Sequence, residues 1–199
     1  MWESRKAEER VEALQQESMV TPANPVPRTP LTGKIGGPFT LTDQDGKLVS
    51  NTDFSGKYLL VYFGYTMCPD MCPTGLQSIA RSLDMLKSEA GKVQPLFITV
   101  DPARDTSARL KYYDALFNPK IIGLTGTAEQ IAAVAKEYQV YYKKGEGDQD
   151  YVVDHSALIY LMDPKGNLVT TFDEQAPPKT IADALRKAWG EPPLPESQK

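Results

Sequence analysis

The chain has 199 residues, a formal net charge of −4 and 41% hydrophobic residues, which suits one domain of ordinary size with tails. Its basic residues are scattered rather than gathered in a stripe, so we do not expect nucleic acid to be a partner. No stretch approaches the roughly eighteen consecutive apolar residues of a membrane span, and no signal peptide is visible.

The two ends of the chain differ in composition from its middle. Residues 3–17 are good helix formers with almost no apolar face, and the prolines between residues 22 and 30 favour an extended linker. We therefore assign residues 1–32 to a helical stalk and Pro-rich linker, residues 33–190 to a folded domain, and residues 191–199 to a disordered tail. The charged opening segment leads us to expect that a targeting or anchoring piece preceded it.

Short apolar runs alternate with helical patterns along the folded part of the chain. In chain order they predict a strand at 39–42, a doubly buried strand at 57–63, a helix at 74–90, a strand at 96–100, a helix at 106–117, a strand at 121–124, a helix at 128–138, a hairpin at 157–162 and 168–172, and a helix at 178–189. This order predicts an α/β domain whose central mixed sheet is flanked by helices, with a C-terminal β-hairpin and helix. It matches a thioredoxin-like fold with an insertion.

Cys68 and Cys72 are the only cysteines, and they follow the buried strand in the segment Cys-Pro-Asp-Met-Cys-Pro. Pro69 cannot continue a strand and Pro73 suits the first turn of a helix, so the segment is predicted to be a tight loop that leads into the next helix. The positive end of a helix dipole favours thiolate, the form that binds metals and attacks disulfides. Two buried core cysteines and a purely structural disulfide are the alternatives, and a functional dithiol is the better interpretation.

The spacing of the two cysteines bears on the kind of dithiol. Redox enzymes of the thioredoxin type place two residues between their cysteines, whereas this chain has three. The wider loop can hold one metal ion, although Cys68 and Cys72 can still close to a redox disulfide. A structural zinc site requires four ligands, and two cysteines cannot complete one. Two thiolates with one imidazole instead suit Cu(I), which accepts three soft ligands.

His155, the only histidine, lies directly before the apolar run 157–162. If that strand runs antiparallel to the strand before Cys68, the two ends coincide and His155 faces the cysteines. Asp154 either orients the imidazole or ends the preceding loop. Asp70 either tunes the charge of the loop or forms the turn, and Asp101 lies on the same predicted edge of the sheet. The pair Asp105-Thr106 that follows is expected mainly to cap a helix.

Together these motifs resemble the Sco family of copper chaperones for cytochrome c oxidase, also known as Sco/SenC. The resemblance covers about residues 33–189. It rests on Gly36-Gly-Pro-Phe39, Tyr62-Phe-Gly-Tyr-Thr66 with the two cysteines, Phe97-Ile-Thr-Val-Asp-Pro-Ala-Arg-Asp105, Gly123-Leu-Thr-Gly126, Asp150-Tyr-Val-Val-Asp-His-Ser156 and Leu161-Met-Asp-Pro164.

The resemblance implies that Cys68, Cys72 and His155 hold copper as Cu(I), with Cu(II) left open. It also implies a role in building the binuclear copper A centre of oxidase subunit II, with an upstream chaperone as copper donor and no enzymatic activity of its own. Family members carry one N-terminal membrane anchor, which this chain lacks, so its first residues are expected to be the juxtamembrane stalk. The domain would face the mitochondrial intermembrane space from the inner membrane, or alternatively the bacterial periplasm.

Two other functions use the same cysteines. A thiol–disulfide oxidoreductase would reduce the copper-site cysteines of subunit II, and it should survive loss of His155, whereas copper retention should not. A peroxidase of the peroxiredoxin kind fits the fold, and Thr66 precedes Cys68 as such a site requires. No neighbouring arginine is evident in the sequence, which counts against the peroxidase.

Overall fold

The computed structural model describes residues 30–195, apart from residues 70, 119 and 148–149. The stalk predicted for residues 3–17, most of the linker and the last four residues of the predicted tail therefore lie outside the described residues. Of the described helices, none combines the length and apolar character needed to cross a membrane.

A seven-stranded sheet in the order β2-β1-β5-β4-β3-β8-β9 forms the centre of the domain. Its middle strands β5, β4 and β3 are parallel, whereas β1, β8 and the two edge strands run antiparallel to their neighbours. The strands are β1 (Thr40–Asp43), β2 (Leu48–Ser50), β3 (Tyr58–Gly64), β4 (Val93–Thr99), β5 (Ile122–Thr125), β8 (Leu158–Met162) and β9 (Leu168–Asp173). The mixed sheet predicted from the sequence is thus confirmed.

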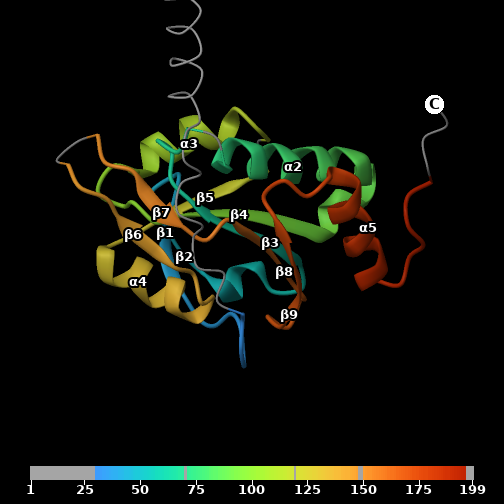
Figure 1. Ribbon diagram of the computed structural model, residues 1–199. Helices are drawn as coiled ribbons and strands as arrows, with labels where there is room; N and C mark the ends of the chain where they lie inside the picture. The colour runs from blue at the N-terminus through green and yellow to red at the C-terminus, as the bar shows by residue number, and fades with distance from the viewer. Residues whose placement is uncertain (1–29, 70, 119, 148–149, 196–199) are drawn as a thin grey trace, which may run out of the picture.

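Helices cover both faces of this sheet (Figure 1). They are α2 (Met71–Leu86), α3 (Ser107–Ala115), α4 (Ala128–Glu137) and α5 (Pro178–Ala188), with the 3₁₀ turns η1 (Asn51–Phe54) and η2 (Lys87–Lys92). The crossovers β3-α2-β4 and β4-α3-β5 step in the same direction, so their right-handedness places α2 and α3 on one face. Helix α4 lies on the other face, and α5 packs beside α2.

Strand β3 positions the functional part of the sheet. Leu60, Val61, Tyr62 and Phe63 are fully buried because helices cover both faces, which explains the unbroken apolar run. Strand β8 pairs with β3 in the antiparallel sense, as the sequence predicts. The carboxyl end of β3 therefore meets the amino end of β8 at one edge of the sheet.

The structure contains three strands that the sequence analysis did not predict. Strand β2 completes a hairpin with β1, while β6 (Tyr142–Lys144) and β7 (Val153–His155) form a separate two-stranded ribbon beside the main sheet. Each has only three residues, too few for a periodic pattern to stand out. His155 is consequently the last residue of β7 rather than part of the loop before β8.

The first residues of the segment 191–199 contact α5. The backbone N–H of Leu194 donates to Asp183 on α5 at 2.7 Å, and Lys179 donates to the carbonyl of Leu194 at 2.9 Å. Residues 191–194 thus lie along α5 and belong to the folded domain.

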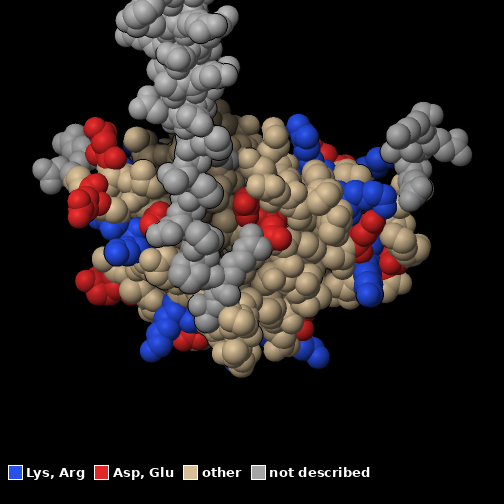
Figure 2. Space-filling view, viewed as in Figure 1, with Lys and Arg blue, Asp and Glu red and all other residues tan. Residues whose placement is uncertain are grey.

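On the face in Figure 2, acidic and basic side chains are interspersed, and no stripe of one sign crosses the described atoms.

Candidate metal centre

The cysteine loop, residues 65–69, connects the end of β3 to the start of α2. The backbone N–H of Cys68 donates to the carbonyl of Tyr65 at 3.2 Å, which closes a turn. Helix α2 starts at Met71, so Cys72 lies in its first turn and its N–H donates to Sγ of Cys68 at 3.4 Å. Both thiols are buried, and the tight loop leading into a helix is as the sequence predicts.

Gly64 allows the sulfur of Cys72 to lie against the end of β3. A Cβ at this position would stand 2.5 Å from Sγ of Cys72 and 2.8 Å from the ring of Phe97, both closer than van der Waals contact permits. The absence of a side chain at residue 64 is therefore a requirement of the site.

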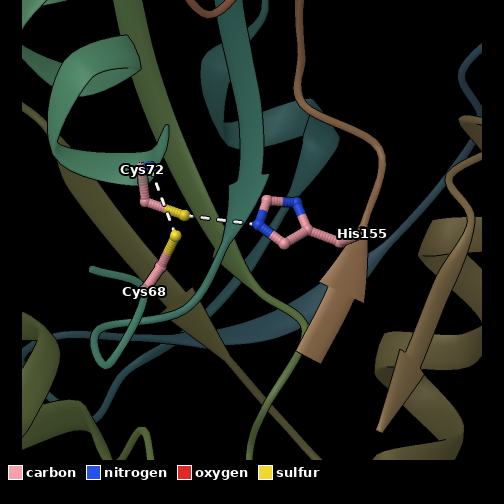
Figure 3. A group of neighbouring side chains, drawn as sticks. All are labelled: Cys68, Cys72 and His155. Carbon is pink, nitrogen blue, oxygen red and sulfur yellow. Dashed lines mark hydrogen bonds between the residues drawn. The ribbon is translucent and has the colours of Figure 1, made fainter. Parts of the chain in front are cut away.

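His155 approaches the cysteines from β7 and is fully buried (Figure 3). Its Nδ1 lies 3.0 Å from the carbonyl oxygen of Ser156, and because a carbonyl only accepts, Nδ1 carries the proton. The lone pair of Nε2 is left free and points to Sγ of Cys72 at 3.4 Å. The Ser156 carbonyl thus fixes the imidazole in the tautomer that a metal ligand needs.

Cys68, Cys72 and His155 together offer two sulfur atoms and one nitrogen, all within 4.8 Å of one another. Two thiolates and an imidazole form a soft donor set, which selects Cu(I) over hard cations such as Mg²⁺ or Ca²⁺. The three predicted ligands come together as expected, although Cys72 and His155 are 83 residues apart in the chain. The residues present fit a three-coordinate Cu(I) ion.

The pKa values of the two thiols are shifted in opposite directions. The hydrogen bond with Cys72, followed by that with His155, lowers the pKa of Cys68 to about 4 despite its burial. Burial, followed by interaction with Cys68, raises the pKa of the Cys72 thiol well above its usual value. At neutral pH the reduced site therefore holds one thiolate and one thiol, and metal binding at both sulfurs releases the remaining proton.

A buried carboxylate holds the cysteine loop in place. Asp105 accepts hydrogen bonds from the backbone N–H of Thr66 at 2.9 Å, from the Thr66 hydroxyl at 2.6 Å and from the Thr99 hydroxyl at 2.7 Å. The loop is thereby attached to the end of β4. The expected helix start at the pair Asp105-Thr106 is confirmed, with Thr106 as the N-cap of α3 that accepts from the N–H of Arg109, whereas the Asp105 carboxylate holds the loop.

The structure also corrects the statement that no arginine neighbours the cysteine segment. Arg109 on α3 donates to the Thr66 hydroxyl at 2.6 Å and to Sδ of Met67 at 2.7 Å. The largest causes that lower the pKa of Cys68 are nevertheless Cys72 and His155. Arg109 therefore supports the loop rather than activating its thiolate.

The predicted supporting acids lie at different distances from the metal ligands. Asp154 is exposed and lies opposite Lys143 in the register of the ribbon, whereas the imidazole Nδ1 donates to the Ser156 carbonyl. Asp101 is buried, but it pairs with Arg104 and accepts a hydrogen bond from Tyr151 rather than from a metal ligand. Asp70 lies outside the described residues.

Sequence reasoning missed an aromatic residue at the site. The ring of Tyr65 meets that of His155 edge-on, with centroids 5.8 Å apart, and its hydroxyl accepts from the backbone N–H of Val153 at 3.3 Å. Its place directly between the buried strand and the cysteines was the available signal. Tyr65 therefore packs against the imidazole from the same loop that carries Cys68.

Comparison with known proteins identifies relatives along most of the chain. The family model described as SCO1/SenC matches residues 27–190. The bovine protein SCO2 homolog, mitochondrial, is 45% identical over 76% of this chain and 58% of its own length. Protein SenC of Rhodobacter capsulatus is 45% identical over 77% of this chain and 70% of its own length. The chain thus spans only about three-fifths of the bovine relative it matches.

Several solved structures are similar to this chain in both sequence and fold. The copper-bound structure of Arabidopsis thaliana ScoI is 44% identical with a TM-score of 0.72, covering 77% of this chain and 96% of that one. The copper-bound structure of Bradyrhizobium japonicum ScoI is 47% identical with a TM-score of 0.72, covering 77% and 98%. BsSco, described as having a disulfide switch and as a member of the Sco family of cytochrome c oxidase assembly proteins, is 27% identical with a TM-score of 0.64, covering 80% and 98%. These neighbours confirm the thioredoxin-like fold expected from the sequence.

The family match covers residues 27–190, and the identities to individual relatives extend over about three-quarters of the chain. The chain belongs to the SCO1/SenC family.

Proposed function

We propose that this protein binds Cu(I) through Cys68, Cys72 and His155 and passes it on during the assembly of cytochrome c oxidase. The observation that carries the proposal is the cluster of two sulfurs and one imidazole nitrogen within 4.8 Å. Relatives of the same fold have been solved with copper bound, and one is described as belonging to a family of cytochrome c oxidase assembly proteins. The protein would act as a carrier of copper rather than as an enzyme.

The acceptor in this proposal is the binuclear copper A centre of oxidase subunit II, and the donor is an upstream copper chaperone. A carrier must release its cargo, and three ligands leave room for an incoming donor atom to attack the metal. The names of relatives support a mitochondrial or a bacterial setting. In this proposal the domain faces the intermembrane space from the mitochondrial inner membrane, or alternatively lies in the bacterial periplasm.

An anaerobic titration of the fully reduced protein with Cu(I) against a competing chelator tests the proposal. We expect one tightly held Cu(I) per chain and an affinity at least about tenfold lower, about 1.4 kcal/mol, in His155→Ala. Asp154→Ala is the matched control, because that neighbouring side chain is exposed and should leave the affinity unchanged. Equal affinities in wild type and His155→Ala would remove the imidazole from the site and contradict the proposal.

Thiol–disulfide exchange is a second candidate, which the Cys68 thiolate and the adjacent Cys72 thiol support. The Cys68 thiolate would attack a disulfide of the partner, and Cys72 would then displace the partner's second thiolate. Cys68 and Cys72 would thereby be oxidised to a disulfide, and the partner would receive two electrons as a dithiol. However, a low pKa at Cys68 stabilises the reduced protein, which makes the pair a weak reductant. Exchange activity retained by His155→Ala, without copper retention, would identify this role.

A further inference from the structure

The ribbon of β6 and β7 that carries His155 depends on contacts with the rest of the domain for its position. Its strands are hydrogen-bonded to each other and not to the seven-stranded sheet. An isolated two-stranded ribbon is marginally stable in water. The place of His155 is thus set by whatever attaches the ribbon to the domain.

The attachment runs along one face of β7. Tyr151, Val153 and His155 are buried, whereas Val152 and Asp154 between them are exposed. This alternation is that of a strand whose every second side chain faces the domain. Tyr151, two residues before β7, and His155 therefore share a face of this extended segment, about 13 Å apart along the chain at about 3.3 Å per residue.

Tyr151 connects this face to Asp101, Arg104 and Lys144. Its hydroxyl donates to Asp101 at 2.6 Å, and Asp101 is itself buried and paired with Arg104. The guanidinium of Arg104 lies 3.6 Å from the centroid of the Tyr151 ring. The ammonium group of Lys144, on the neighbouring strand, lies 3.9 Å from the same centroid. A hydrogen bond to a buried carboxylate is among the stronger ones that a neutral side chain makes.

We propose that Tyr151 and Asp101 are positioning residues for His155, because their hydrogen bond fixes the ribbon against the segment that follows β4 and so determines how firmly the imidazole holds copper. Neither residue touches a metal ligand, and each acts through β7. When the bond is broken, the ribbon keeps its own strand pairing and the hydrogen bond from the N–H of Val153 to Tyr65, but it loses its hydrogen bond to the segment after β4. The imidazole then leaves the metal more often, and copper remains on the two cysteine sulfurs, exposed to an acceptor.

This inference rests on the proposed function, since it assumes that His155 is a copper ligand. Before copper can be transferred, the His155 imidazole must leave the metal. The inference is that the hydrogen bond between Tyr151 and Asp101, outside the metal site, controls this step. The contact joins residues from the segment after β4 to the segment before β7, so it can change without unfolding either the main sheet or α2.

A double-mutant cycle with Tyr151→Phe and His155→Ala tests the proposal, with Cu(I) affinity measured by chelator competition. Tyr151→Phe removes only the hydroxyl and keeps the ring under Arg104 and Lys144. We expect it to weaken Cu(I) binding about tenfold and to reduce the nitrogen contribution to the copper X-ray absorption spectrum. In the His155→Ala background we expect no additional effect, because the ligand that Tyr151 positions is already gone.

Tyr141→Phe is the matched control, because it makes the same change beside the same ribbon at a side chain that is 40% exposed. It should leave the affinity and the spectrum as in wild type, and thermal unfolding should show all variants folded. Tyr151→Phe binding like wild type would overturn the inference, and so would equal weakening with and without His155. An unchanged affinity in His155→Ala alone would instead overturn the proposed function.

Discussion

Gly64 shows how much a single residue contributes to the copper site. A Cβ there would lie 2.5 Å from Sγ of Cys72 and 2.8 Å from the ring of Phe97, so it would clash with both side chains. Phe97 is fully buried in the core, so it has little freedom to move away. Of the two neighbours, the first turn of α2 is the one that must shift.

We therefore expect Gly64→Ala to weaken Cu(I) binding at least about tenfold, because it displaces one of the three ligands. Gly91→Ala is the matched control, since a Cβ at Gly91 meets no atom within 4 Å. Chelator competition on both variants measures the effect, with circular dichroism to show that they are folded. An unaltered affinity in Gly64→Ala would mean that the site relaxes around the added methyl group.

At the scale of elements, α5 stabilises the helix that carries Cys72. Ile181, Ala182 and Leu185 on one side of α5 are fully buried, and this helix packs against α2. At the end of the pair, Arg186 forms a salt bridge with Glu89. The contribution of α5 is therefore to stability, and it lies away from the metal ligands.

Leu185→Ala should lower the free energy of unfolding by about 2–5 kcal/mol, as large-to-small changes in a packed core do. Chemical denaturation measures this loss, and Lys187→Ala at an exposed position of the same helix should change stability little. Cu(I) affinity of the folded variant should stay within about twofold of wild type, since additivity holds for distant sites. A large loss of affinity would show that α5 positions the first turn of α2 as well.

The helices and strands also differ in how well the sequence predicts them. The long runs of β3 and β4 and the periodic helices α2, α4 and α5 were predicted because their patterns repeat over enough residues. Strands β6 and β7 were not, because three residues with Lys143, Lys144 and Asp154 among them carry no alternation of their own. Helix α2 begins three residues earlier than predicted, with Pro73 inside its first turn.

At the scale of the whole molecule, a buried acid away from the copper site links folding to pH. Asp114 on α3 is almost fully buried, and neither carboxyl oxygen has a hydrogen-bond partner among the described residues. Burial, with a smaller contribution from Asp105, raises the pKa of Asp114 to about 8. The carboxyl is therefore protonated in the folded protein at neutral pH.

The unfolded chain has the ordinary value of 3.8 for this group, so between about pH 4 and 8 the folded state binds one proton more than the unfolded state. Stability must then fall as the pH rises through that window, by at most about 1.4 kcal/mol per pH unit from this group. Asp114→Asn removes the titration, so its unfolding free energy should decline less between pH 5 and pH 8. Urea unfolding at both pH values measures this, with Asp84→Asn at an exposed site as control. Parallel pH profiles of wild type and Asp114→Asn would contradict the assignment.

The sequence by itself determined the ligands and the class of fold. Two cysteines and one histidine are the chain's whole supply of thiol and imidazole donors, so a site built from these groups had to use Cys68, Cys72 and His155. The alternation of apolar runs with helical patterns determined an α/β domain, because those periodicities follow from local backbone geometry. The antiparallel pairing of β8 with β3 was a condition taken from the thioredoxin-like fold, and the structure confirms it.

Only the tertiary structure decided what holds those ligands. Tyr151 and Asp101 are 50 residues apart, and Thr66 and Asp105 are 39 apart, yet each pair is hydrogen-bonded. Such contacts leave no trace in a local pattern, because an aspartate that anchors a loop looks in sequence like one that caps a helix. The close approach of Cys72 to Gly64 is hidden in the same way, since a glycine in sequence does not show what lies within reach of its missing side chain.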